Sequence, residues 1–535
     1  MKAVWLTLAL LAVAVASDGC KRRSAKPAPQ AQTASASLAA APAHGAEAGI
    51  DWFKGDVDAA FAEAQRSNRP VFLYWGASWC PPCHELKATV FSRPDFIEKS
   101  RLFVTVYLDG DNPGAQKWGE VFRVQGYPTV LILRPDRTEL ERISGGMDLS
   151  LYGEALDLAL GDVHPAEELL ATLGTSSAAL SRDDCRRLAY NAWFLDREAS
   201  AASAQLAEHL ARAAERCPAD AKVERARLYV AAASAQSLAE KPAIDAHRKP
   251  SASLSALLAQ VQNVLEDPAL ASTCADSLES LDPAYFAGVK ASGADTQRLE
   301  RAWVAAMDAA AADPRYSEAD HLDALEAKLE AVKAFAPGNV IPAPLATEAH
   351  ARIDAALKRT TEEHARASVV NNALNVLQVL GDDDQSYALL KQQMATSRSP
   401  YYYMDDIADL DEKHGRTDEA IGWLARGYAE SQGAATRFQW GTNYVMGLMR
   451  MRPADDTRIR SATLEVLGEL DGPDRIYQRT RVRLARLDAN LRKWNTHGEH
   501  AQTIAVLRKR MDDICAKVPE NAPSRSACAG FLAAT

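Results

Sequence analysis

Two cysteines near the start of the chain, Cys80 and Cys83, have the type and spacing of a redox-active dithiol. The apolar run 71–75 precedes them and a helical apolar pattern follows, so both sulfurs are expected at a strand-to-helix turn. A thiol at a helix N-terminus meets unpaired N–H groups and the positive end of the helix dipole, which lower its pKa. Cys80 has that position, and thiol–disulfide exchange requires the thiolate that such a shift supplies.

The second cysteine completes the chemistry. Cys83 lies one helical turn further along, close enough to attack a mixed disulfide on Cys80 and resolve it. Pro81 occupies a place where a helix start tolerates proline, and Pro82 removes a further N–H and stiffens the turn. The pair is therefore expected to cycle between dithiol and disulfide, with the two prolines helping to set its reduction potential.

The elements that must position this pair alternate between helix and strand up to about residue 160. Apolar spacing predicts helices over 57–64, directly after Cys83, over 116–122 and over 151–160. It predicts strands over 71–75, 102–108, 124–133 and 140–143, separated by turn clusters rich in Asp, Gly and Pro. This alternation predicts an α/β layer fold of ordinary domain size.

Three motifs in this segment resemble the thioredoxin superfamily. They are Trp79-Cys80-Pro81-Pro82-Cys83, the loop Gly126-Tyr127-Pro128-Thr129 before a buried strand, and the break Gly145-Gly146 before the last helix. Residues 83–91 and the turn 109–111 are most similar to the C-terminal domain of periplasmic thiol:disulfide interchange proteins. The resemblance implies a thioredoxin-like domain over 50–162, with a central mixed sheet flanked by helices.

The resemblance also implies roles for matching residues. Cys80 would be the attacking, exposed thiolate and Cys83 the more buried, resolving one. Trp79 would cover the edge of the site, beside Pro82. Pro128, expected in cis, would place the Tyr127 backbone beside the sulfurs, where it pairs with a substrate strand and keeps metal from the dithiol. The alternatives are that Trp79 is simply a core residue and that Tyr127 serves only packing.

Two positions depart from the family pattern. Tyr74 stands where thioredoxins carry a buried Asp, six residues before the first cysteine, and Lys87 stands where the interchange domain has an acid. Such a carboxylate assists proton transfer at the resolving cysteine. Glu85 is near in sequence but is expected to face away from Cys83. Proton transfer would therefore fall to the Tyr74 hydroxyl, to water, or to no group at all.

Metal binding is the competing interpretation of the dithiol. A zinc site would need a second pair of ligands, which this region lacks, and the remaining cysteines do not have zinc-site spacing. His497 and His500 have no acidic or thiol ligands nearby and are expected to be solvated. We therefore expect no metal and no cofactor other than the redox-active Cys80–Cys83 pair.

The N-terminus has the features of an export signal. Lys2 and the apolar run 3–16 are typical of a signal peptide over 1–19, too short to span a bilayer. Processing at 14–16 by ordinary signal peptidase competes with a lipobox-like sequence, 17–20, in which Cys20 would be lipidated. Because 20–49 has the Ala, Pro and Ser content of a flexible tether, the lipid-anchored form is favoured over a soluble periplasmic one. Both place the protein in the periplasm of a Gram-negative bacterium.

The chain has 535 residues, too many for one core, and a formal net charge of −10 with no extended basic block in its body. Nucleic acid is therefore not an expected partner. An oxidising compartment permits structural disulfides. Cys185–Cys217 and Cys515–Cys528 are plausible pairs, leaving Cys274 free or paired with Cys20, but the connectivity stays open.

From 163 to 535 the pattern becomes all-helical. Leu380-Gly381-Asp382 and His414-Gly415-Arg416 are separated by 34 residues, the tetratricopeptide period, and the turn after His414 resembles that family. A tetratricopeptide-like array around 366–470 and irregular helical hairpins are equally compatible with this signal. Stacked hairpins form concave surfaces for peptides or proteins. The aromatic residues 401–403, Phe438 and Trp440 would line such a groove or belong to the core.

Two functions from different classes follow. The first is an exported thiol–disulfide oxidoreductase, favoured as a reductase or isomerase, that acts on protein thiols and disulfides and draws on a membrane redox donor, with a helical region that recruits clients. The second is a helical binding or assembly protein whose thioredoxin-like domain is vestigial, motivated by Tyr74 and Lys87. Cytochrome-maturation thioreduction would need a haem-binding client that no residue specifies.

Overall fold

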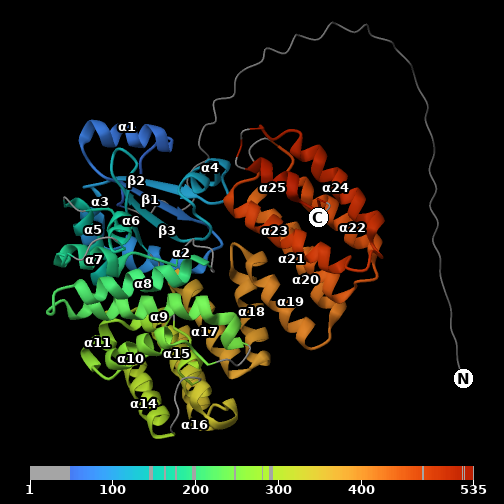
Figure 1. The fold of residues 1–535 in the computed structure, drawn as a ribbon. Helices are drawn as coiled ribbons and strands as arrows, with labels where there is room; N and C mark the ends of the chain where they lie inside the picture. Colours follow the sequence, from blue (N-terminus) through green and yellow to red (C-terminus); the bar gives the residue numbers. More distant parts are fainter. Residues whose placement is uncertain are drawn as a thin grey trace, which may run out of the picture. The chain divides into compact units, whose positions relative to one another are not determined.

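Four strands form a mixed sheet in the first part of the chain (Figure 1). The computed structural model describes residues 49–143, 149–161, 164–174, 178–194, 201–245, 249–279, 281–287, 293–472, 475–520, 522 and 524–533. The strand order is β2-β1-β3-β4; β1 is parallel to β2 and antiparallel to β3, which is antiparallel to β4. The strands are β1 (Val71–Gly76), β2 (Val104–Asp109), β3 (Thr129–Leu133) and β4 (Glu139–Ile143).

Helices cover both faces of this sheet, which explains why β1 is buried along its whole length. Side chains alternate along a strand, so Val71, Leu73 and Trp75 pack on the α1 and α4 side. Phe72 and Tyr74 point to the opposite face, where they meet residues of α2, α3 and α5. The helices are α1 (Val57–Ser67), α2 (Pro81–Leu86), η1 (Lys87–Phe91), α3 (Pro94–Ser100), α4 (Pro113–Val121) and α5 (Leu149–Leu160).

The predicted α/β fold is confirmed: each expected strand and helix is present, with boundaries shifted by a few residues. The largest shift is at the third strand, which begins at Thr129 because the preceding residues form the loop that carries Pro128. The second strand begins at Val104, after a turn. Gly145 and Gly146 lie outside the described residues.

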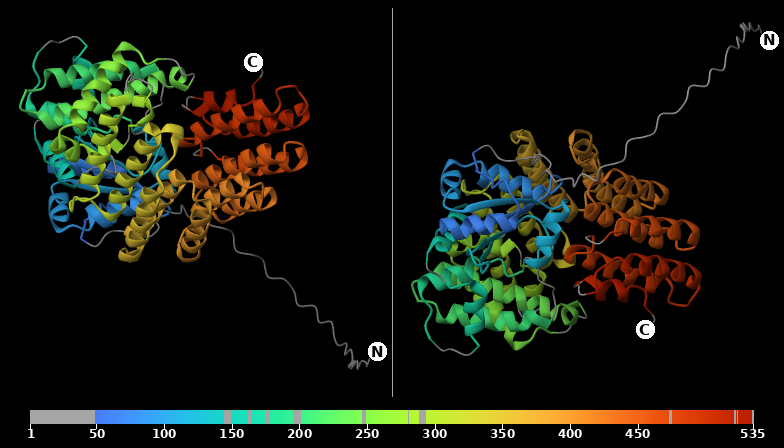
Figure 2. Two further views of the ribbon diagram at one scale, coloured as in Figure 1. Left: turned by 90° about the horizontal axis from the view of Figure 1, so that it is seen from below. Right: turned by 90° about the horizontal axis from the view of Figure 1, so that it is seen from above.

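The rest of the described chain is helical, as the sequence predicts. Its helices pack in three successive apolar cores along the chain, visible in sequence order in Figure 2. The first set is α6 (Ala166–Thr172), α7 (Arg182–Tyr190), α8 (Ala201–Arg216), α9 (Lys222–Asp245), α10 (Ala252–Leu265), α11 (Pro268–Thr273), α12 (Ala275–Glu279), α13 (Ala284–Ala287), α14 (Gly293–Ala310), α15 (Glu318–Phe335), η2 (Pro337–Asn339) and α16 (Ala343–Arg359).

The later helices are shorter on average and are joined by tight turns. They are α17 (Glu363–Leu380), α18 (Asp383–Thr396), η3 (Pro400–Tyr403), α19 (Met404–Lys413), α20 (Thr417–Glu430), α21 (Ala434–Met451), α22 (Asp456–Gly468), α23 (Gln478–Trp494), α24 (Ala501–Cys515) and α25 (Ser524–Gly530). Gly381 and Gly415 both adopt φ +74° in the turns that precede α18 and α20. The two glycines of the 34-residue signal are thus structurally equivalent, because only glycine adopts this backbone conformation without strain.

The thioredoxin-like segment and the helical region are packed together in one compact unit. The edge strand β4 is covered by the segment around α7: Ala192 N–H donates to Arg142 O over 2.8 Å. Beside it, the fully buried Arg187 donates to Glu141 Oε2 over 2.9 Å. Burial raises the pKa of Glu141 to about 8, and the Arg187 charge opposes that rise.

Two disulfides staple the helical region. Cys185 bonds to Cys217, and Cys515 bonds to Cys528, which confirms the two pairings expected from the sequence. Cys274 is buried as a free thiol. Among the described residues no helix combines the length and apolar character needed to cross a membrane.

Candidate redox site

Cys80 and Cys83 are joined in a disulfide at the start of α2, with Cα atoms 5.2 Å apart. Cys80 is the N-cap residue, and its Sγ accepts a hydrogen bond from Cys83 N–H over 3.1 Å. Pro81 and Pro82 are the first two residues of the helix, where proline costs no intrahelical hydrogen bond. The expected strand-to-helix placement of the dithiol is therefore confirmed.

The Tyr127-Pro128 loop lies beside the disulfide, and its peptide bond is cis, as the resemblance implied. Trp79 and Tyr127 both pack on the small cluster formed by Ala77, Cys80 and Cys83. The Tyr127 hydroxyl donates to Gly110 O over 3.1 Å and accepts from Gln116 Nε2 over 2.7 Å. The structure thus gathers Trp79, Cys80, Cys83, Tyr127 and Pro128 at one place, and their catalytic roles remain predictions.

Tyr74 lies below the dithiol, in the core between the sheet and α2. Its ring is stacked on Tyr107 at 5.4 Å between centroids and meets Phe91 edge-on at 4.9 Å. A Cβ on Gly76 would lie 2.5 Å from the Tyr74 hydroxyl oxygen, so this hydroxyl reaches the end of β1 that leads to the cysteines. Lys87 is buried too, with its ammonium 5.7 Å from the Tyr107 ring centre.

One expectation is wrong: Cys80 is not exposed. Its relative accessibility is 2%, and that of Cys83 is 0%. The physical reason is that the helical region packs over the face of α2 that carries the cysteines, with α17 lying along α2 (Figure 1). Ser368 of α17 donates its hydroxyl to Pro81 O, between the two cysteines, over 2.9 Å.

Trp79 is where the two parts of the chain meet most closely. Its ring is stacked on Tyr402 at 6.1 Å and meets Trp440 edge-on at 5.4 Å. The guanidinium of Arg479 lies 5.3 Å from the Trp79 ring centre and 4.7 Å from that of Tyr127. Trp440, Tyr401 and Phe438 are themselves buried in a helical core, so these aromatic residues form core and site together.

Asp111 is a site residue that sequence reasoning missed. Trp79 Nε1 donates to its carboxylate over 3.1 Å, and the Thr436 hydroxyl donates to its other oxygen. Burial raises the Asp111 pKa to about 6, while the hydrogen bond from Thr436 and the Arg479 charge favour the ionised form. The turn 109–111 was recognised, but its contact with residues more than 300 positions away carries no local sequence signal.

Other contacts of α2 were missed for the same reason. His84 Nε2 donates to Ser78 O over 2.8 Å, and its Nδ1 forms a hydrogen bond with His364 Nδ1. Glu85 faces away from the cysteines, as expected, and accepts from the Ser317 hydroxyl over 2.6 Å. Burial and the neighbouring Asp320 raise the Glu85 pKa well above its usual range.

Metal binding finds no support in the described part of the chain, where no group of three or more His, Cys, Asp or Glu side chains is arranged to hold an ion. The leader and Cys20 lie outside the described residues. Pro82 is exposed on the first turn of α2, at the rim of the site.

A mixed sheet, a cis-proline loop and a dithiol at a helix N-terminus define a thioredoxin-like domain, and a thioredoxin-like family profile matches residues 51–135. The chain is similar to thiol:disulfide interchange protein DsbD 1 of Pseudomonas aeruginosa, with 28% identity over 104 residues, 19% of this chain and 18% of that protein. It is also similar to an H-type thioredoxin of Oryza sativa subsp. indica, with 29% identity over 93 residues, 17% of this chain and 70% of that protein.

The alignments cover only the first domain of this chain and less than one fifth of the interchange protein. Residues 51–135 therefore belong to the thioredoxin-like family, and the fold, the dithiol and the relatives together support a thiol–disulfide oxidoreductase.

Proposed function

We propose that this protein is an exported thiol–disulfide oxidoreductase that reduces or isomerises disulfides of periplasmic proteins. The observation that carries the proposal is the Cys80–Cys83 pair at the N-terminus of α2, beside the cis-proline loop. The interchange protein that resembles this domain supports a reducing direction by analogy alone.

The proposed reaction is two successive thiol–disulfide exchanges. The Cys80 thiolate attacks one sulfur of a client disulfide, forms a mixed disulfide and releases a client thiolate. Cys83, once deprotonated, attacks Sγ of Cys80, which releases the second client thiolate and forms the Cys80–Cys83 disulfide. Two electrons pass from the dithiol to the client, so a membrane thiol–disulfide donor must then reduce the protein. In isomerisation the client's own thiol resolves the mixed disulfide and no net electrons are transferred.

The helical region would recruit or position the client. Its helices form most of the described chain, and Tyr402, Trp440 and Arg479 stand directly beside Trp79. A tetratricopeptide-like use of α17–α20 for binding peptides fits the equivalent turns at Gly381 and Gly415.

Trapping tests this function. The Cys83→Ser variant is expected to accumulate mixed disulfides on Cys80 in cells, because the resolving thiol is gone, and mass spectrometry then names the clients. The Cys80→Ser, Cys83→Ser variant is the matched control. Purified wild-type protein that fails to reduce insulin, although its Cys80 thiol reacts with an alkylating reagent, would argue against the proposal.

The alternative function is a binding or assembly protein in which the redox pair is vestigial. The burial of Cys80 to 2% is the observation that favours it, together with Tyr74 and Lys87 in place of family acids. A folded Cys80→Ala, Cys83→Ala variant that retains the cellular phenotype would support this alternative, and one that loses the phenotype would exclude it.

A further inference from the structure

The redox site is enclosed by four elements of the helical region, α15, α17, α21 and α23, together with the turn η3; we call these five elements the cover. We propose that the cover is an autoinhibitory gate: Cys80 and Cys83 exchange disulfides only after the cover separates from the thioredoxin-like domain. This inference rests on the proposed function, since it concerns the regulation of the same site.

The cover meets the site through both polar and aromatic contacts. Ser317, the N-cap of α15, binds Glu85, and Ser368 of α17 binds Pro81 O, at 2.6 and 2.9 Å. Tyr402 of η3 and Trp440 of α21 enclose the Trp79 ring. The remaining contact is at the rim, where Arg481 of α23 pairs with Glu120 of α4 at 2.6 Å.

These contacts block the chemistry that the dithiol would perform. A thiolate attacks a disulfide along the S–S axis and needs direct access to one sulfur. With accessibilities of 2% and 0%, neither sulfur is open to a protein thiol. The region that covers them is part of the same chain, so its local concentration is high and the closed state does not depend on protein concentration.

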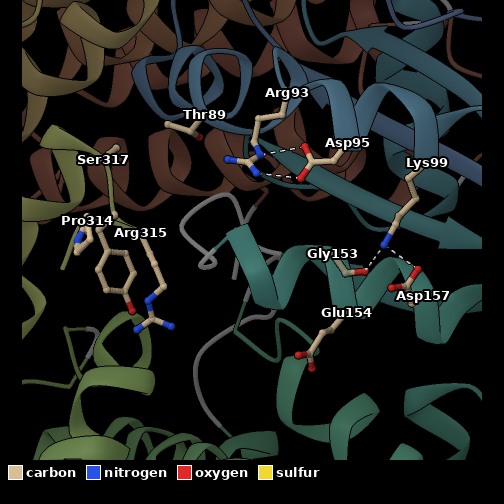
Figure 3. A pocket seen from close by; sticks show the side chains of 11 residues that line it. Thr89, Arg93, Asp95, Lys99, Gly153, Glu154, Asp157, Pro314, Arg315 and Ser317 are labelled. Carbon is tan, nitrogen blue, oxygen red and sulfur yellow. Dashed lines mark hydrogen bonds and ion pairs between the residues drawn. The ribbon is translucent and has the colours of Figure 1, made fainter.

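The seam between the cover and the domain is not packed along its whole length. A cavity of about 610 Å³ lies beside Ser317, between the loop before α15 and helices α3 and α5 (Figure 3). Its charged side chains are paired within their own side of the cavity: Arg93 with Asp95, Lys99 with Asp157, and Arg315 with Asp313. These ion pairs do not bridge the two sides, so separation of the cover would leave them intact.

Gly433, the N-cap of α21, offers a precise way to open the gate. A Cβ at this position would lie 2.7 Å from Asp111 Cβ and 3.2 Å from the Asp111 carbonyl oxygen, so the cover must move to admit it. Gly415 is the matched control, because its φ of +74° is close to the +77° of Gly433 but a Cβ there would meet open space. Both Gly→Ala variants therefore carry similar backbone strain, and only Gly433→Ala disturbs the closed contact.

The test measures how fast dithiothreitol reduces the Cys80–Cys83 disulfide in the full chain, with isotope-coded alkylation of both cysteines and mass spectrometry. We expect Gly433→Ala to be reduced about tenfold faster than wild type or more, and Gly415→Ala to match wild type. Equal rates in the three proteins, or equal acceleration in both variants, would overturn the gate.

A second pair of variants keeps the test decisive if Gly433→Ala does not fold. Ser317→Ala combined with Ser368→Ala removes two hydrogen bonds across the seam without adding atoms, and faster reduction is again expected. Ser255→Ala is its control, since that hydroxyl binds only Ser251 O of its own helix. Unchanged reduction of the double variant would contradict the gate.

The outcome is separable from that of the proposed function. Faster chemical reduction of the open variants without any insulin reduction would support the gate and refute the oxidoreductase. Wild-type insulin reduction as fast as that of the open variants would support the oxidoreductase and refute the gate.

Discussion

At the scale of single residues, the unresolved step is proton transfer behind Cys83. The acids that the family places near this thiol are replaced by Tyr74 and Lys87, and both side chains are buried. The Tyr74 hydroxyl reaches the end of β1, next to Gly76. Of the two replacements it is therefore the better placed to exchange a proton with the resolving thiol.

Replacement of Tyr74 by Phe tests this role. We expect the rate of insulin reduction to fall by about tenfold, at the low end of what a general acid–base group contributes, with no loss of folded protein. Tyr107→Phe is the matched control, since its ring is stacked on Tyr74 in the same core. Equal activity of the Tyr74→Phe and wild-type proteins across the pH range would assign the proton transfer to water.

At the scale of elements, the short helix α2 carries the chemistry and the contact with the cover on its two sides. Its N-terminus holds Cys80 and Cys83, while His84 and Glu85 meet the cover through His364 and Ser317. Both side chains are held in their neutral forms. Burial under the cover lowers the pKa of His84 to about 4, and burial with Asp320 raises that of Glu85. Closure of the cover is therefore linked to pH.

The two groups act in opposite directions. The His84 pKa is lowered in the closed state, so its contribution is complete above about 6.5 and is lost as pH falls towards 4. The Glu85 pKa is raised, so its contribution is complete below about 4.5 and is lost as pH rises. His364, Glu362 and Lys87 face His84, while Asp320 and Asp323 face Glu85 and carry the same sign of charge.

We predict that closure changes little between pH 4.5 and 6.5, where the two effects offset each other, and weakens above 6.5. The measurement is the rate of Cys80–Cys83 reduction relative to an unstructured disulfide peptide at each pH. Glu85→Gln is expected to abolish the alkaline rise and to reveal faster reduction on acidification below 6.5. A Glu85→Gln protein with the wild-type pH profile would contradict this linkage.

At the scale of the whole molecule, two disulfides support the helices that build the cover. Cys185–Cys217 ties α7 to the end of α8, and Cys515–Cys528 ties α24 to α25. Both lie in the helical region, away from the Cys80–Cys83 cluster. We therefore regard them as structural and the Cys80–Cys83 bond as the reactive one.

Removal of the longer loop closure should destabilise the fold without changing the chemistry. Cys185→Ser with Cys217→Ser is expected to lower the free energy of unfolding by about 3–4 kcal/mol, because the unfolded chain gains entropy. Urea denaturation of the variant and the wild type measures this difference. The rate of Cys80–Cys83 reduction in native protein should stay unchanged; an altered rate would instead tie this disulfide to the gate.

The anchoring of the chain is a prediction from sequence alone. If Cys20 is lipidated, Cys20→Ser should lose incorporation of labelled fatty acid and move from the membrane to the soluble periplasmic fraction. A wild-type protein found only in the soluble fraction would favour ordinary signal peptidase and processing at 14–16. Neither outcome affects the fold of the thioredoxin-like domain.

Local patterns were enough to predict the α/β fold, because strands and helices with one or two buried faces leave a periodic apolar signal. They also located Cys80, Cys83 and the Tyr127-Pro128 loop, since helix starts and proline turns depend on neighbouring residues. The pairings Cys185–Cys217 and Cys515–Cys528 were anticipated because each joins segments close in sequence.

What only the tertiary structure decided is what covers the cysteines. Ser368, Trp440 and Arg479 lie hundreds of residues from Cys80, and each has ordinary helical neighbours, so its contact with the site depends on how the helices pack. The exposed thiolate implied by family resemblance was wrong for this reason: resemblance describes the domain, whereas accessibility belongs to the assembled chain. The sequence by itself determined the chemistry of the dithiol, and long-range packing decided its access to a client.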